Sequence, residues 1–246
     1  MKRNKIFLPF LAILVFSVLQ SFALGNSNSG IPLLGDDAPS FKAEATTGPI
    51  NFPNDFGDQW KVIFSHPADF TPVCSSELLE LAAIQEDLKK MNVAIIVIST
   101  DKLETHNSWI KSIDSVKYKN REPQQIHFPL VADEDHSIAR KYGMIHSSTN
   151  TTRYVRGVFI IDPLNKVRAM FFYPMNIGRN FDEITRTILA LQTSDADKIL
   201  IPADWHAGDD VLIPYTKSTS DQWEAAKKED PDLYMLTWYM WFRKMK

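Results

Sequence analysis

The sequence FSHPADFTPVCSSELLEL, residues 64–81, contains the only cysteine of the chain, Cys74. An apolar run at 61–66 leads into this stretch and predicts a short β-strand. Apolar residues at three- to four-residue spacing follow the cysteine and predict an amphipathic helix over 74–91. The stretch therefore predicts a strand, a proline-containing loop and a helix whose first residue is the cysteine.

Periodic segments continue on the C-terminal side of this unit. Further strands are predicted at 93–100, 128–133, 154–162 and 166–174, and further helices at 103–114, 134–143 and 181–192. The last two strands flank the turn sequence PLN and predict a hairpin. Alternating strands and helices followed by a hairpin predict an α/β fold with a mixed central sheet flanked by helices. The composition changes near residue 197, where we place a boundary before a smaller C-terminal region.

The N-terminal residues have the pattern of a secretory signal peptide. Lys2, Arg3 and Lys5 precede an apolar run over 6–19, and Ser21-Phe22-Ala23 is a small-x-small cleavage pattern. The apolar run is shorter than the roughly 20 residues that a membrane-spanning helix needs. We therefore expect a signal peptide at 1–23, a linker at 24–35 and an exported protein, periplasmic or secreted, and we favour cleavage over a retained membrane anchor.

Composition narrows the function classes. The net charge of −3 gives no broad signal for binding nucleic acid, and a hydrophobic content of 44% supports a packed core. Cysteines of exported proteins usually pair, but one cysteine cannot form an internal disulfide. Cys74 is therefore either a buried inert residue or a reactive thiol, and its neighbours decide between the two.

The neighbours of Cys74 favour a thiolate, which is the nucleophilic form of cysteine. A helix start offers unpaired backbone N–H groups and the positive end of the helix dipole to an anion. Thr71 can offer its hydroxyl to the sulfur or to a bound oxygen, and Pro67 and Pro72 restrict the loop. A cation is still needed, and an arginine on a strand elsewhere in the chain is the expected source.

Several separated motifs resemble those of peroxiredoxins. PADFTPVC (67–74) resembles the active-site motif of that family, RGVFIID (156–162) resembles its arginine-bearing motif, and GDDAPSF (35–41) resembles its usual opening. HPADFTPVC, YPMNIGRNFDEI and PADWHAGDDVLIP together resemble the one-cysteine, peroxiredoxin-six-type subfamily. The resemblance runs from about residue 35 to the C-terminus, in the order that the family uses.

This resemblance implies a fold and a chemistry. It implies a thioredoxin-like peroxidase domain at 36–196 and a C-terminal peroxiredoxin extension at 197–246. Cys74 would be the peroxidatic nucleophile, which attacks hydrogen peroxide or an organic hydroperoxide and becomes a sulfenic acid. Thr71 and Arg156 would hold the peroxide oxygens, Pro67 would shield the sulfur, and His66 would tune the thiol. The implied mechanism uses no metal, haem or other cofactor.

The resemblance also implies partners. The chain has no second cysteine to resolve the sulfenic acid, so the reductant would be an external thiol: a thioredoxin-like protein, glutathione or a small thiol. A homodimer is implied as well. Two alternatives remain open, namely a peroxide-sensing redox relay and a chaperone without high turnover. The complete set of Thr71, Cys74 and Arg156 favours turnover.

Two further groups of residues receive plainer interpretations. The remaining histidines show no metal-ligand spacing, and we expect them to lie on the surface or to cap helices; they are His106, His127, His136, His146 and His206. The aromatic and basic C-terminal sequence DLYMLTWYMWFRKMK (232–246) could contact a membrane surface. We favour its packing against the body of the protein or against a partner subunit.

Overall fold

The computed structural model describes residues 30–149, 152–214 and 220–245. The expected signal peptide and most of the expected linker lie outside these residues. Within the described part of the chain, every helix is too short or too polar to span a lipid bilayer. The proposed domain boundaries therefore stay predictions.

A five-stranded mixed sheet forms the centre of the protein, in the order β5-β4-β3-β6-β7. Its strands are β3 (Trp60–Ser65), β4 (Val93–Ser99), β5 (Leu130–Ala132), β6 (Arg156–Ile161) and β7 (Val167–Tyr173). β4 runs parallel to β3 and β5, whereas β6 runs antiparallel to β3 and β7. This arrangement confirms the expected α/β fold with a mixed sheet, including the hairpin of β6 and β7.

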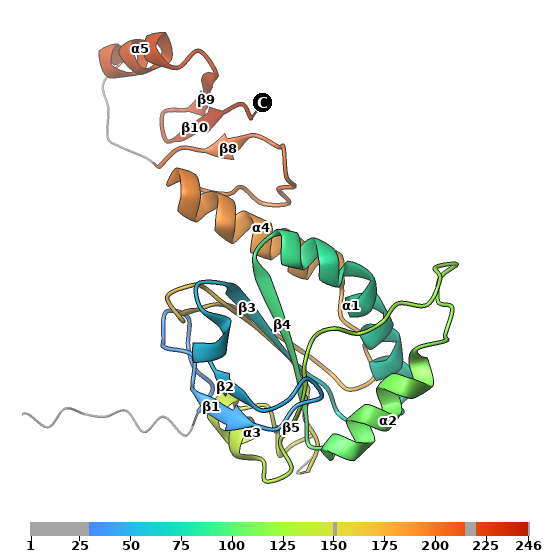
Figure 1. Ribbon diagram of the computed structural model, residues 1–246. Helices are drawn as coiled ribbons and strands as arrows, with labels where there is room; N and C mark the ends of the chain where they lie inside the picture. The colour runs from blue at the N-terminus through green and yellow to red at the C-terminus, as the bar shows by residue number, and fades with distance from the viewer. Residues whose placement is uncertain (1–29, 150–151, 215–219, 246) are drawn as a thin grey trace, which may run out of the picture.

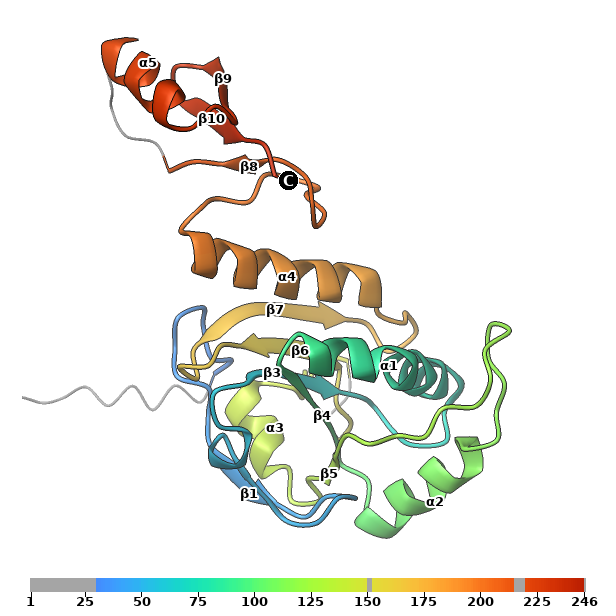
Figure 2. The same cartoon turned by 45° about the horizontal axis from the view of Figure 1, so that its top comes forward.

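Helices cover both faces of the sheet because neighbouring strand residues point to opposite faces. Val62 and Phe64 of β3 belong to the core beneath α1 (Pro72–Lys90), α2 (Leu103–Ile113) and α4 (Phe181–Asp197). Ile63 belongs to the core that contains α3 (Ser137–Tyr142). Figure 2 shows α1 and α3 on opposite sides of the strands. The two cores hold the end of β3, and hence the loop that leads to Cys74, between packed layers.

Capping explains where two of these helices begin and end. Asn180 precedes α4, and its side chain accepts hydrogen bonds from the backbone N–H groups of Asp182 and Glu183. The helix continues to Asp197, five residues beyond the predicted end. α3 ends at Gly143, which adopts the left-handed conformation that favours glycine.

Two regions of strand were absent from the sequence interpretation. β1 (Phe41–Ala43) and β2 (Ile50–Phe52) form an antiparallel pair, and a short 3-10 helix, η1 (Asn54–Phe56), follows them. The C-terminal region contains β8 (Val211–Leu212), α5 (Ser220–Glu229), β9 (Leu233–Thr237) and β10 (Met240–Arg243). β10 lies between β8 and β9 in a small antiparallel sheet.

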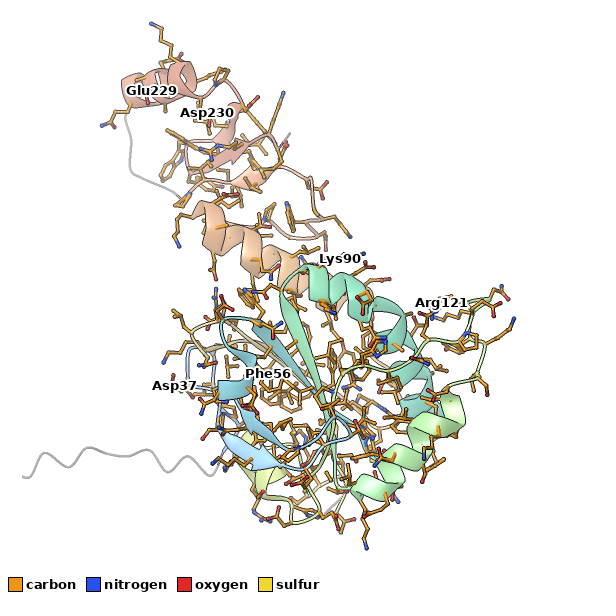
Figure 3. The ribbon with its side chains drawn as sticks, in the orientation of Figure 1. Asp37, Phe56, Lys90, Arg121, Glu229 and Asp230 are labelled. Carbon is orange, nitrogen blue, oxygen red and sulfur yellow. The ribbon has the colours of Figure 1, made fainter. Side chains whose placement is uncertain are left out.

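The C-terminal sheet extends away from the body of the protein beyond the end of α4 (Figures 1 and 2). A small core that includes Ile199, Trp205 and Val211 attaches its base to the second half of α4. Arg243 of β10 donates to Asp230, which Figure 3 labels near α5. In the described residues, β10 pairs with β8, and Met245 near the end of the tail packs against this small core. Packing of the tail against a partner subunit stays a prediction.

Candidate active site

Cys74 lies in the first turn of α1. Thr71 is the N-cap residue in an extended conformation, and Pro72 is the first helical residue, where a missing N–H costs nothing. The helix thus begins two residues earlier than predicted and places Cys74 at its third position. Backbone N–H groups of a first turn have no partner within the helix, so they favour an anion at this place. The sulfur is nevertheless enclosed, because Cys74 is 1% exposed.

Arg156 provides the cation beside the sulfur. It is the first residue of β6, which pairs directly with the strand that leads into the Cys74 loop. Its Nη1 donates to Sγ of Cys74 over 3.3 Å, and its Nε and Nη2 donate to the carbonyl oxygen of Met175 over 3.0 and 2.6 Å. The side chain is buried, so the charge of Arg156 faces the sulfur and its neighbours rather than solvent.

Glu77 and Arg179 complete this group, and the sequence interpretation missed both. Glu77 lies one turn after Cys74 on α1, and its carboxylate accepts from Nη1 of Arg156 over 2.7 Å. The same carboxylate accepts from the backbone N–H, Nε and Nη2 of Arg179 over 2.9, 3.0 and 2.6 Å. An acidic residue on the apolar face of a helix was the available signal, because a buried carboxylate needs a partner.

The second arginine also ties the two central strands together. Nη1 of Arg179 donates to the carbonyl oxygens of Ser65 and Gly157 over 2.9 and 3.1 Å. A side chain at Gly157 would place its Cβ 3.0 Å from Oγ of Ser65, so glycine permits the close approach here. Arg179 therefore holds the end of β3 in register with the start of β6.

The buried charged side chains around the sulfur of Cys74 carry a net positive charge. Two guanidinium groups, those of Arg156 and Arg179, face one carboxylate, that of Glu77. Arginine stays protonated in proteins, which leaves one positive charge in excess when Glu77 is ionised. A thiolate on Cys74 removes this excess, and burial makes an uncompensated charge costly. The arrangement therefore favours the ionised form of Cys74.

Thr71 and Pro67 line the loop that precedes the helix. The Thr71 hydroxyl donates to the carbonyl oxygen of Ala68 over 3.0 Å, so toward another group its oxygen acts as an acceptor. Pro67 is buried. Phe70, between them, has a φ of 54°, in the left-handed region that non-glycine residues rarely adopt. The loop is therefore held in a specific, strained conformation.

In the part of the chain that the structure describes, the partner of His66 is Asp69 and not the sulfur of Cys74. Nε2 of His66 lies 2.8 Å from Oδ1 of Asp69. Burial lowers the pKa of His66, and the hydrogen bond to Asp69 only partly opposes this effect. Burial alone would raise the pKa of Asp69, but hydrogen bonds from His106 and His66 hold it below its ordinary value. A neutral His66 beside an ionised Asp69 follows.

His106 corrects one expectation from the sequence. It was expected on the surface or at a cap, but it is fully buried on α2, with Nδ1 at 2.7 Å from Oδ2 of Asp69. The ligand atoms of His66, Asp69 and His106 lie within 4.8 Å of one another, a spacing that could hold a metal ion. The packing of α2 against β5 turns His106 toward the interior. The sequence of α2 alone does not reveal this packing.

Comparisons with known proteins agree with this geometry. The model of the AhpC/TSA family matches residues 34–170, and that of the C-terminal domain of 1-Cys peroxiredoxin matches residues 190–228. A peroxiredoxin of Methanosarcina mazei is 43% identical over 87% of this chain and 98% of its own length.

Solved structures give the same result. A yeast mitochondrial 1-Cys peroxiredoxin is 37% identical, with a TM-score of 0.75 over 87% of this chain and 100% of its own. A cysteine-to-serine mutant of peroxiredoxin 6 of Arenicola marina is 33% identical, with a TM-score of 0.76 over 88% of this chain and 99% of its own. The thioredoxin-like fold with a C-terminal extension is therefore confirmed.

Proposed function

This chain belongs to the peroxiredoxin family and is a thiol peroxidase with the one-cysteine type of C-terminal domain, and we propose that Cys74 is its peroxidatic sulfur, with Thr71 and Arg156 as the groups that hold the peroxide. The observation that carries this assignment is the 3.3 Å contact between Nη1 of Arg156 and Sγ of Cys74. A second observation supports the assignment: the two arginines leave an excess positive charge beside the sulfur, which a thiolate neutralises.

The reaction follows from the positions of these groups. The thiolate attacks one peroxide oxygen, an S–O bond forms, and the O–O bond breaks. Its electron pair stays with the departing oxygen, which takes a proton and leaves as water or an alcohol. Arg156 stabilises the negative charge on that oxygen, and the Thr71 oxygen accepts a hydrogen bond from the peroxide. Pro67 covers the product sulfenic acid. His66 holds the loop through its hydrogen bond to Asp69.

The sulfenic acid is returned to a thiol by a second molecule. The chain has one cysteine, so an external thiol attacks the oxidised sulfur, water leaves and a mixed disulfide forms. A second thiol then attacks the external sulfur of this disulfide and releases the Cys74 thiolate. The yeast 1-Cys relative is described as resolved through glutathione/thioredoxin systems. We assign the same class of reductant here: a thioredoxin-like protein, glutathione or another small thiol.

A homodimer is the assembly that we propose, with the C-terminal sheet as part of its contact. Four neighbouring side chains at the end of this sheet are exposed by 45–70%: Met235, Leu236, Trp238 and Tyr239. Large apolar side chains exposed close together in the chain often mark a contact with a partner. A second copy of the chain fits the resemblance to the extended dimers of this subfamily better than a membrane surface does.

We also propose that the protein is exported, periplasmic or secreted, after removal of residues 1–23. The support is the charged start, apolar run and small-x-small pattern of these residues. Mass spectrometry of the protein purified from its native source tests this assignment, because cleavage leaves a defined new N-terminus. An intact N-terminus retained in the membrane fraction would contradict it.

The decisive experiment compares the wild type with Cys74→Ser. We expect hydrogen peroxide to be consumed over many turnovers when a thiol reductant is present, and Cys74→Ser to lose this consumption while its circular dichroism spectrum stays unchanged. One equivalent of peroxide consumed per chain, with no further turnover, would instead support the redox relay. Retained turnover in Cys74→Ser would overturn the assignment of the sulfur.

A further inference from the structure

A buried histidine-aspartate-histidine group lies behind the loop that carries Thr71. Asp69 sits in this loop, two residues before Thr71, and its carboxylate lies between the rings of His66 and His106 at 2.8 and 2.7 Å. His106 comes from α2, thirty-seven residues further along the chain. The three side chains are buried, at 2%, 6% and 0% exposure in chain order. A long-range contact of this kind anchors the loop to a different part of the fold.

Both ring nitrogens of His106 face acceptors. Nδ1 faces the Asp69 carboxylate, and Nε2 lies 3.2 Å from the carbonyl oxygen of Val131. The ring is therefore held from both sides, and its contact with Asp69 joins α2 to the loop that precedes α1.

The other oxygen of Asp69 fixes the state of His66. Nε2 of His66 donates to it, which leaves Nδ1 of His66 without a proton, buried and without a partner among the described residues. Each nitrogen that faces the carboxylate lies at hydrogen-bond distance from it. These distances are those of a hydrogen-bonded chain from His66 through Asp69 to His106.

The backbone of the loop depends on the same aspartate. The N–H of Asp69 donates to Oδ2 of Asp101 over 2.9 Å, and Phe70 follows in the left-handed conformation. A strained residue of this kind persists only where its neighbours hold it in place. Thr71 comes directly after it, and its hydroxyl is oriented by the carbonyl oxygen of Ala68. The hydrogen bonds that hold Asp69 therefore determine where the Thr71 oxygen lies relative to the sulfur.

We propose that His106 is a positioning residue for peroxide reduction, which acts through Asp69 on the loop that places Thr71. The inference rests on the proposed role of Thr71 as a group that holds the peroxide. His106 contacts neither the sulfur nor the peroxide in this scheme. Its contribution is to keep the acceptor oxygen of Thr71 at the distance that the reacting peroxide needs.

The test compares two reactions of Cys74 in the same variants. Oxidation by hydrogen peroxide, followed in a single turnover by stopped flow, needs both the thiolate and Thr71, whereas alkylation by iodoacetamide needs the thiolate alone. We expect His106→Leu to slow the peroxide reaction about ten- to a hundredfold, the size of effect that a small misplacement produces, and to leave alkylation within about twofold. His106→Asn keeps an N–H near the position of Nδ1, so it should restore most of the rate.

Two controls separate this role from general damage. Tyr142→Phe removes a different buried hydrogen bond, from the tyrosine hydroxyl to Pro39, and should leave both reactions unchanged. In a double-mutant cycle, His106→Leu should add little to Thr71→Val, because both changes remove the same contribution. Equal slowing of oxidation and alkylation, or full additivity with Thr71→Val, would overturn the proposal.

The outcomes also distinguish this inference from the function it rests on. If Thr71→Val leaves the peroxide reaction unchanged, the proposed role of Thr71 fails, and the role of His106 fails with it. If Thr71→Val slows the reaction but His106→Leu does not, only the present inference fails. One equivalent of zinc or another divalent metal in the purified wild type, lost in His106→Leu, would replace the hydrogen-bonded chain by a metal site and overturn the proposal.

Discussion

Nη1 of Arg156 lies 3.3 Å from Sγ of Cys74, although 82 residues of chain separate the two. The contact exists because β6 returns antiparallel to β3, so that the first residue of one strand meets the end of the other. The loop after β3 then leads directly into the helix that carries the cysteine. Sheet topology, rather than local sequence, brings the cation to the sulfur.

Replacing Arg156 by methionine should weaken Cys74 as a nucleophile. The thiolate loses a charge-assisted hydrogen bond of about 1.5 kcal/mol, which corresponds to roughly a tenfold smaller thiolate fraction at neutral pH. Alkylation by iodoacetamide, measured from pH 5 to 9, should shift its rise to higher pH, and peroxide oxidation should slow by more than alkylation. Arg168→Met is the matched control, because Arg168 pairs with Asp195 and Asp162 away from the sulfur. An unshifted alkylation profile would remove Arg156 from the site.

Glu77→Gln should destabilise the protein severely. The change keeps the shape of the side chain but leaves two buried guanidinium groups without their carboxylate. Removal of one member of a buried ion pair costs about 3–5 kcal/mol, whereas a half-exposed pair contributes at most about 1 kcal/mol. Urea unfolding of Glu77→Gln and of the control Asp195→Asn should show this difference. A similar loss in both variants would contradict the central role of Glu77.

His66 should make the protein less stable as the pH falls. Its pKa is lowered by burial, so below about pH 6.5 the unfolded chain binds a proton that the folded chain refuses. The free energy of unfolding therefore falls with decreasing pH until the folded-state pKa is reached. Asp69 acts in the same direction at lower pH, because its pKa is also held low. Urea midpoints between pH 7.5 and 5 should depend less on pH in His66→Gln than in the wild type.

The proposed dimer contact can be tested with two leucines of similar exposure. Leu236, on the C-terminal sheet, is 64% exposed, and Leu164, on the turn between β6 and β7, is 78% exposed. Leu236→Glu should shift the protein from dimer to monomer in sedimentation velocity, because it places a charge in the apolar contact. Leu164→Glu should leave the dimer intact. Dissociation by both variants, or by neither, would argue against this surface as the contact.

The fold was largely predictable because its main elements are long and regular. The apolar runs that became β3, β4, β6 and β7 stand out in the sequence, and Gly143 and Asn180 mark helix ends by their chemistry. Three of the missed strands are very short: β1 and β2 have three residues each and β8 has two, whereas β9 and β10 have five and four. So few residues give no measurable periodicity, and long-range pairing decides their conformation.

The site was predictable where one segment carries the chemistry. Cys74, Thr71 and Pro67 lie within eight residues, and their types point to thiol chemistry without any structure. Glu77 and Arg179 pair across 102 residues, and His106 reaches Asp69 across 37, so only the folded chain shows these contacts. His106 was expected on the surface or at a helix cap because nothing local distinguishes a buried histidine from an exposed one.

The burial of the sulfur affects the entry of the peroxide and the entry of the reductant differently. A hydroperoxide is small enough to slip into a narrow opening, but Cys74 is 1% exposed, and a bulky reducing protein needs far more room. A small thiol can reach the sulfur with less rearrangement of its surroundings than a protein reductant needs. The packing that encloses the oxidised sulfur therefore makes the rate of its reduction depend on the size of the thiol that enters.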